Sequence, residues 1–91
     1  MDLHLKNKAA IVGGASMGIG YGIARTLAFE GARVAITARR EQRLTEAAER
    51  LRAETGAEIL PVQADCRRPE DCDRVTATVV EEFGGIDILV N

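Results

Sequence analysis

Short apolar runs alternate along the chain with longer segments whose apolar residues recur at helical spacing. The apolar runs span residues 8–13, 33–38, 58–64 and 86–91, and the helical segments span residues 18–30, 41–55 and 69–83. An apolar run with little polar alternation is typical of a strand that is covered on both faces, as in a parallel sheet. The pattern therefore predicts a β-α-β-α-β-α-β order with parallel pairing and right-handed crossovers.

Each helical segment predicts one apolar face. The expected faces are Ile19, Ile23 and Leu27 with Ala24 and Ala28 beside them in the first helix, Leu44, Ala47, Ala48 and Leu51 in the second, and Cys72, Val75, Val79 and Phe83 in the third. Gly22 lies inside the first helix, where it costs about 1 kcal/mol relative to Ala. A close approach of this helix to the sheet would explain the glycine.

The order of the strands follows from two features. If the first strand is central, the sheet has the order 3-2-1-4. Pro61 removes a ladder donor from the third strand, so this strand is expected at a sheet edge. The chain therefore predicts an α/β fold, the N-terminal half of a doubly wound parallel sheet. Such sheets bind ligands at the carboxyl ends of their strands, where the loops after Ala38 and Ala64 and residue Asn91 would meet.

A glycine-rich turn links the first strand to the first helix. Its sequence is Gly13-Gly14-Ala15-Ser16-Met17-Gly18-Ile19-Gly20. A turn of this kind directs backbone N–H groups and the positive end of the helix dipole at one point, and a pyrophosphate is the usual ligand there. No Lys-Ser/Thr pair follows the turn, since Tyr21 comes directly after Gly20, and this excludes a phosphate-loop hydrolase.

The composition and net charge of the chain exclude several classes of binding partner. The 91 residues have a net charge of −2, which gives no general attraction to nucleic acid or to an anionic membrane. Because we find neither a secretory signal nor an apolar run of about 18 residues, we expect a cytoplasmic protein. Cys66 and Cys72, with a single distant His4, do not form a recognisable zinc site, so no metal is expected. Two free thiols, at least one partly buried, are favoured over a disulfide across a strand-to-helix junction.

Together these residues resemble the N-terminal part of a short-chain dehydrogenase/reductase. The family signature T-G-x-x-x-G-x-G is present at residues 13–20, with Gly13 in place of the usual Thr. Asp65 follows the third strand, where family members carry an aspartate that contacts adenine. Residues 88–91 resemble the lead-in to the family's N-N-A-G motif, with its first Asn at Asn91. The resemblance implies a Rossmann-type fold and leans toward the 3-oxoacyl carrier-protein reductase and sugar-dehydrogenase branches.

The resemblance also implies an activity. The family transfers hydride between NAD(P) and a carbonyl or alcohol substrate, using a Ser, a Y-x-x-x-K pair and a further Asn. That catalytic segment is not in these residues, and Tyr21 with Arg25 has the wrong position and the wrong base. We therefore expect no catalytic residue here, but a dinucleotide-binding half-domain over residues 1–91 of a longer, homo-oligomeric reductase. The alternative is a nucleotide-binding module without chemistry.

The residues at the end of the second strand predict whether the chain binds NAD or NADP. NAD-preferring relatives place an acidic residue near its end, to bind the ribose 2′-hydroxyl. Here Ala38 is followed by Arg39 and Arg40, and a guanidinium favours the 2′-phosphate of NADP. NADP is therefore expected, with NAD as the alternative. Both arginines could instead be solvated charges, for example facing Glu41.

The residues expected to bind the cofactor are Gly14, Ser16, Met17, Gly18, Ile19, Gly20, Ala38, Arg39, Arg40, Asp65, Cys66 and Asn91. Three of them carry specific roles or alternatives. Ser16 either donates its hydroxyl to a phosphate or caps the turn. Asp65 either contacts adenine or caps the helix near Pro69, and Cys66 is expected to act through its backbone N–H.

Overall fold

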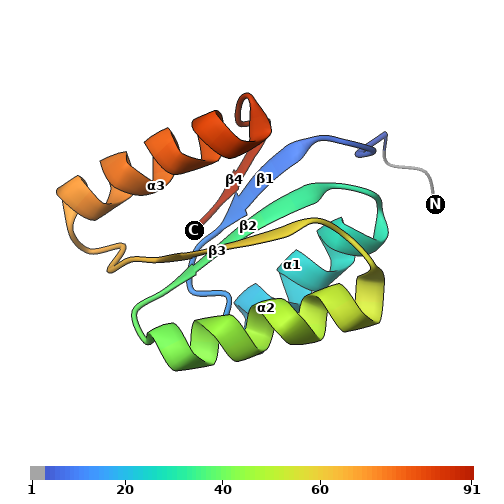
Figure 1. Cartoon of the computed structure of the whole chain (residues 1–91), viewed down its shortest axis with the longest axis horizontal. Coiled ribbons are helices and arrows are strands. Elements are labelled where there is room, and N and C mark those ends of the chain that lie inside the picture. Colours follow the sequence, from blue (N-terminus) through green and yellow to red (C-terminus); the bar gives the residue numbers. More distant parts are fainter. Residues whose placement is uncertain (1–3) are drawn as a thin grey trace.

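The structure, a computed structural model, describes residues 4–91 and contains a four-stranded parallel sheet with three helices (Figure 1). Its elements are β1 (Ala9–Val12), α1 (Gly18–Phe29), β2 (Arg33–Ala38), α2 (Glu41–Thr55), β3 (Ile59–Gln63), α3 (Pro69–Phe83) and β4 (Ile88–Val90). The strand order is β3-β2-β1-β4, and all three strand pairings are parallel. The predicted order is confirmed, and β3 with Pro61 lies at an edge.

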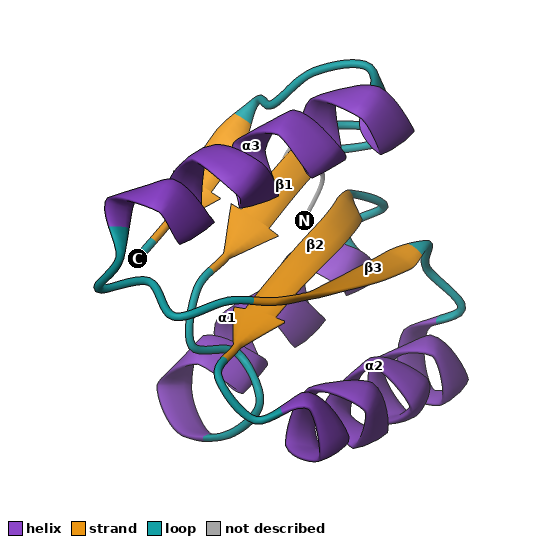
Figure 2. Cartoon of the chain, turned by 60° about the vertical axis from the view of Figure 1, so that its left-hand side comes forward, coloured by secondary structure: helices purple, strands orange, loops and turns teal. Residues whose placement is uncertain are grey.

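Helices cover both faces of the sheet. Helices α1 and α2 lie on one face and α3 lies on the other (Figure 2). Two apolar clusters correspond to these two faces. Val34 and Ile36 of β2 pack with the cluster of α1 and α2, and Ala35 packs with the cluster of α3. Because neighbouring residues of β2 are buried on opposite faces, the strand needs no polar alternation, which explains its continuous apolar sequence.

The helix ends follow local sequence signals. Pro69 occupies the first turn of α3, where its missing N–H leaves no hydrogen bond unmade. Helices α2 and α3 end at Gly56 and Gly84, whose φ angles of 71° and 82° are left-handed. Such a glycine lets the chain leave the helix while its N–H closes the last turn, onto Arg52 O and Val80 O respectively.

The expected face of α1 is wrong in part. Ile19 is 84% exposed, and the buried residues of the helix are Ala24 and Ala28. Ile23 and Leu27 are only partly buried. Ile19 lies in the first helical turn, directly after the glycine turn has left the sheet, and its side chain joins neither apolar cluster. The helix packs through small side chains instead.

The expected explanation of Gly22 is also wrong. Apart from its chain neighbours and the backbone of its own helix, a Cβ added at Gly22 would meet no heavy atom of the described residues within 4 Å. The close approach occurs at Gly20, where an added Cβ would collide with the carbonyl group of Gly14. The glycine that the packing requires is therefore at the start of α1, against the turn rather than against the sheet.

Of the two cysteines, Cys72 differs from expectation. Both Cys66 and Cys72 are free and exposed. Cys72 lies in the first turn of α3, where its thiol faces the Cys66 carbonyl oxygen at 3.5 Å rather than the core. The buried face of α3 consists of Val75, Val79 and Phe83 alone. The expectation of two free thiols is confirmed. The Cys66 thiol makes a partly buried contact with Thr37 Oγ1, as expected for one of the two, whereas the expectation that Cys72 belongs to the apolar face of α3 is wrong.

Candidate functional site

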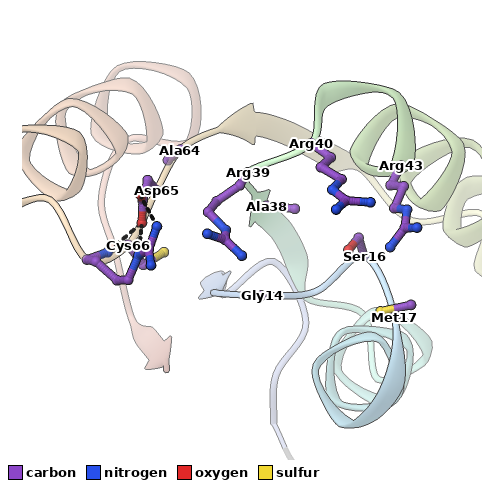
Figure 3. Close-up of a pocket in the computed structure, with 11 residues that line it drawn as sticks. Gly14, Ser16, Met17, Ala38, Arg39, Arg40, Arg43, Ala64, Asp65 and Cys66 are labelled. Carbon is purple, nitrogen blue, oxygen red and sulfur yellow. Dashed lines mark hydrogen bonds and ion pairs between the residues drawn. The ribbon is translucent and has the colours of Figure 1, made fainter.

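Three loops meet at the carboxyl ends of β1, β2 and β3 and enclose a pocket of about 470 Å³ (Figure 3). The lining residues are Gly14, Ser16, Met17, Ala38, Arg39, Arg40, Arg43, Ala64, Asp65, Cys66 and Arg67. Eight of the twelve expected cofactor residues are in this set. The pocket therefore lies at the carboxyl edge of the parallel sheet, where the sequence predicts that a ligand binds.

The four other expected residues lie beside the pocket. Gly18, Ile19 and Gly20 belong to the start of α1 and do not line it. Asn91 lines a second, smaller cavity of about 120 Å³, between α3 and β4. Cys66 lines both cavities and so marks where they adjoin.

The glycine turn is held by backbone hydrogen bonds to both neighbouring strands. Gly13 N donates to Val90 O at 2.9 Å, and Ala15 N donates to Thr37 O at 3.0 Å. Gly14 has a φ of +63°, a left-handed conformation that residues with a side chain rarely adopt. The turn is thus fixed between β2 and β4 without the threonine hydroxyl that the family usually has at residue 13.

Side chains from two other elements lie against Gly13. Thr37 Oγ1 and Cys66 Sγ are 3.3 Å apart, and a Cβ added at Gly13 would contact them at 3.7 and 3.5 Å respectively. Thr37 is the one polar residue among the described residues that is buried, at 1% exposure. Sequence reasoning missed Thr37. Its signal was a single hydroxyl within an otherwise apolar strand.

Helix α1 begins beside the pocket, because its N-cap Met17 is one of the lining residues. Met17 is the N-cap and makes no side-chain capping hydrogen bond, and the first turn contains no acidic residue. The first N–H groups of a helix have no partner inside the helix, and they carry its partial positive charge. This end of α1 is therefore suited to an anionic group.

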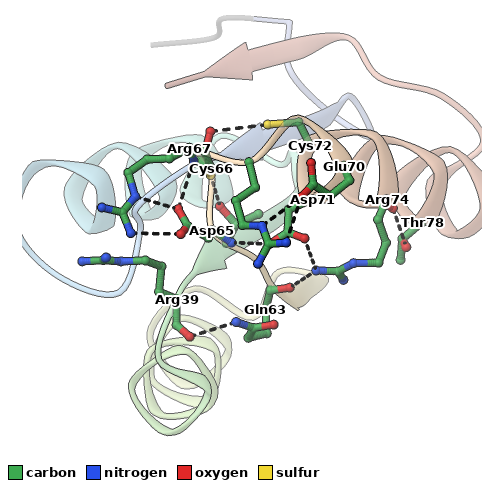
Figure 4. Close-up of polar contacts among 12 residues, drawn as sticks. Arg39, Gln63, Asp65, Cys66, Arg67, Glu70, Asp71, Cys72, Arg74 and Thr78 are labelled. Atoms are coloured by element: carbon green, nitrogen blue, oxygen red, sulfur yellow. Dashed lines mark hydrogen bonds and ion pairs between the residues drawn. The ribbon is translucent and has the colours of Figure 1, made fainter.

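Asp65 forms a closed pair with Arg67 at the opposite side of the pocket (Figure 4). Asp65 Oδ1 accepts hydrogen bonds from Arg67 N and Nε, and Oδ2 accepts one from Arg67 Nη2, all at 3.0 Å. These bonds are the main reason that the pKa of Asp65 is lowered to about 2, and the charge of Arg39 lowers it further. The N-cap of α3 is Arg68, so the alternative role of Asp65 as the cap of that helix is wrong.

Two side chains of α3 form hydrogen bonds that hold the loop carrying Asp65 in place. Asp65 N donates to Asp71 Oδ2 at 2.8 Å, and Arg74 Nη2 donates to Gln63 O at 2.6 Å (Figure 4). Gln63 Nε2 in turn donates to Arg39 O at 2.9 Å. These contacts tie the ends of β2 and β3 together and set the position of Asp65 relative to Arg39.

Four arginines line the pocket, and Arg39, Arg40 and Arg43 remain without a carboxylate partner among the described residues because only Arg67 is paired, with Asp65. Figure 3 shows the Arg39 side chain on the side of Asp65 and Cys66, and the side chains of Arg40 and Arg43 directed toward Ser16 and Met17. None of the ion pairs found among residues 4–91 joins Arg40 to Glu41, the partner considered from the sequence. Sequence reasoning missed Arg43, although its spacing of three from Arg40 indicates one side of a helix.

Tyr21 has a structural position away from this pocket. Its hydroxyl donates to Glu54 Oε1 at 2.6 Å, and the Arg50 guanidinium lies 4.5 Å from the ring centroid. Burial is the largest cause of a raised Tyr21 pKa, followed by the hydrogen bond to Glu54. Tyr21 thus joins α1 to α2.

Among residues 4–91, no group of three or more His, Cys, Asp or Glu side chains is placed to hold a metal ion. None of the helices described has the length and apolar character needed to cross a bilayer.

Comparison with known proteins identifies the class that this fold and pocket define. The family model described as short chain dehydrogenase matches residues 8–91. The chain belongs to the short-chain dehydrogenase/reductase family, and it corresponds to the cofactor-binding region of these oxidoreductases.

Individual relatives agree with this assignment. The chain is 41% identical over 88 residues to 11-beta-hydroxysteroid dehydrogenase 1A of Arabidopsis thaliana, covering 97% of this chain and 25% of that protein. It is 40% identical to dehydrogenase/reductase SDR family member 4 of Homo sapiens, covering 96% of this chain and 31% of that protein.

Solved structures share the fold closely. L-sorbose reductase from Gluconobacter frateurii, complexed with NADPH and L-sorbose, is 44% identical, with a TM-score of 0.96 over 100% of this chain and 35% of that one. An alcohol dehydrogenase from Thermococcus sibiricus, complexed with 5-hydroxy-NADP, is 38% identical, with a TM-score of 0.84 over 90% of this chain and 35% of that one. The chain thus spans about a quarter to a third of the length of these four proteins.

Proposed function

We propose that the chain binds NADP(H) and supplies the cofactor-binding part of an oxidoreductase that transfers hydride between the nicotinamide and a carbonyl or alcohol. The observation that carries the proposal is the end of β2. Ala38 occupies the place of a ribose-binding carboxylate, and Arg39 and Arg40 follow it into the pocket. A carboxylate there would repel a 2′-phosphate, whereas guanidinium groups bind it with charge-assisted hydrogen bonds.

The parts of the pocket suit the parts of the cofactor. The glycine turn and the open N-terminus of α1 suit the pyrophosphate, with the Ser16 hydroxyl available to donate. Asp65 and the backbone of Cys66, at the other side, suit the adenine. The bound cofactor would supply the hydride chemistry. The protein residues named here would bind it and fix its orientation.

The choice between NADP and NAD has a direct test. One charge-assisted hydrogen bond contributes about 1.5–3 kcal/mol, which corresponds to roughly ten- to a hundredfold in affinity. Titration of the protein with NADPH and with NADH should therefore give at least about tenfold tighter binding of NADPH. Arg39→Ala should reduce this preference. Equal affinity of the unmutated protein for both cofactors would contradict the proposal.

A nucleotide-binding module without chemistry is the second candidate. It is favoured by the lining of the pocket, which among the described residues includes no tyrosine or lysine to act as an acid–base pair. The complete protein as the gene expresses it, incubated with NADPH and a panel of ketones and sugars, distinguishes the two. Oxidation of NADPH supports the enzyme, and binding without oxidation supports the module.

The likeness to a reductase solved with L-sorbose supports the sugar-dehydrogenase branch, while the 3-oxoacyl carrier-protein branch stays a prediction. A homo-oligomeric parent enzyme and a cytoplasmic location also stay predictions from the sequence.

A further inference from the structure

We infer that Arg43 is a specificity-determining residue, which binds the 2′-phosphate of the cofactor from α2 while Arg39 and Arg40 bind it from the end of β2. The inference rests on the proposed binding of NADP(H) and adds a residue to it. Arg43 lies outside the sequence pattern that led to that proposal.

The position of Arg43 comes from the start of α2. Arg40 is the N-cap of the helix, with an extended backbone, and Arg43 follows within the first turn. Both residues line the pocket, and Figure 3 shows both side chains extending from α2 toward Ser16 and Met17. An anion between the glycine turn and α2 would therefore have a guanidinium on its α2 side.

Arg40 and Arg43 differ from most other arginines of the chain in that their guanidinium groups have no polar partner among the described residues. The remaining arginines each contact a carboxylate, a carbonyl oxygen or an aromatic ring, namely Arg25, Arg33, Arg50, Arg52, Arg67, Arg68 and Arg74. Within residues 4–91, no hydrogen bond or ion pair involves the guanidinium of Arg40 or Arg43. Arg39 adds a third positive charge, and it acts on Asp65 through space only.

Arg67 is paired with Asp65, and the three other guanidinium groups of the pocket repel each other unless an anion lies between them. A phosphate monoester carries a charge of roughly −1.5 to −2 at neutral pH and three acceptor oxygens. It can accept hydrogen bonds from more than one arginine at a time. The 2′-hydroxyl of NAD carries no charge, so Arg43 should contribute to NADP binding and little to NAD binding.

The test compares ligands that differ by the 2′-phosphate. Arg43→Gln removes the charge of an exposed side chain and keeps its polarity, so the fold should be retained, as circular dichroism would check. Arg50→Gln is the matched control, because Arg50 is on the same helix, contacts the Tyr21 ring and does not line the pocket. Calorimetric titrations would use NADPH, NADH, 2′,5′-ADP and 5′-AMP.

We expect Arg43→Gln to weaken binding of NADPH and of 2′,5′-ADP about tenfold, and to change binding of NADH and 5′-AMP less than about twofold. Arg43→Lys should restore part of the loss, and Arg50→Gln should change none of the four affinities. An unchanged preference for NADPH in Arg43→Gln would overturn this inference and leave the proposed function standing. An equal loss for both cofactors would also overturn it. If the unmutated protein showed no preference for NADPH, the proposed function itself would fail.

Discussion

The guanidinium of Arg67 binds the carboxylate of Asp65 through two side-chain hydrogen bonds of 3.0 Å each. The two residues lie in the loop that follows β3, at the side of the pocket where adenine is expected. Both Asp65 carboxylate oxygens thus have a partner within the loop. Adenine binding at Asp65 would share these oxygens with Arg67 or displace it.

The Asp65–Arg67 pair predicts a pH dependence. The pKa of Asp65 is lowered from 3.8 to about 2 in the folded protein. A lowered folded-state pKa stabilises the fold at pH values above the ordinary pKa of Asp, and this contribution is lost as the pH falls from about 4 to about 2. Arg67→Gln should raise the pKa of Asp65 toward its ordinary value. An NMR titration of the Asp65 carboxyl carbon would measure the change.

The control for that titration is Arg68→Gln. Arg68 pairs with Glu70 and makes no side-chain bond to Asp65 among the described residues. Its substitution should leave the Asp65 pKa near 2. A pKa that stays near 2 in Arg67→Gln would show that another group holds the carboxylate.

Substitution by alanine at two glycines of α1 should change the stability of the protein in opposite directions. Gly20→Ala would push a methyl group into the carbonyl group of Gly14, and Gly14 C would lie only 3.0 Å from it. This variant should lose stability and cofactor affinity together. Gly22→Ala meets no described atom within 4 Å outside its neighbours and its own helix backbone, and it should stabilise the protein by about 0.5–1 kcal/mol through helix propensity.

Chemical denaturation measures both effects. Gly20→Ala should show a lower midpoint and Gly22→Ala a higher one. A Gly20→Ala variant that matched the unmutated protein in both stability and NADPH affinity would contradict the close packing of α1 on the glycine turn.

Cofactor binding should protect one thiol more than the other. Cys66 and Cys72 are both exposed, but only Cys66 lines the larger pocket. Alkylation by iodoacetamide, followed by peptide mass mapping, should therefore modify both residues without ligand. NADPH should slow the modification of Cys66 several times more than that of Cys72. Equal rates at both cysteines, unchanged by NADPH, would place the cofactor elsewhere.

The fold followed from the sequence because its signals are local and strong. The bounds of α2 and the start of α3 match expectation, since glycine and proline mark these positions. The position of β3 at an edge followed from Pro61. Strand β2 spans its whole apolar run, whereas β1, β3 and β4 are shorter than theirs because the end residues belong to the turns, as at Gly13.

The errors concern packing, which periodicity does not specify. Helical spacing placed Ile19 on a buried face, but small residues such as Ala24 form the contact with the sheet. Arg43 and Arg67 were missed because their roles depend on which loops meet at the pocket. The Thr37–Cys66 contact joins residues 29 positions apart, and no pattern within either segment indicates it.

The most direct measurement of the central claim is an NMR titration of the amide-labelled protein with NADP. If the pocket at the carboxyl edge binds the cofactor, the amide signals of Gly14, Ser16 and Gly18 should shift, together with those of residues 38–43 and 64–67. The signals of Gly31 and Gly56, at the other ends of the helices, should stay in place. Shifts confined to those helix ends, or none at saturating NADP, would contradict the account.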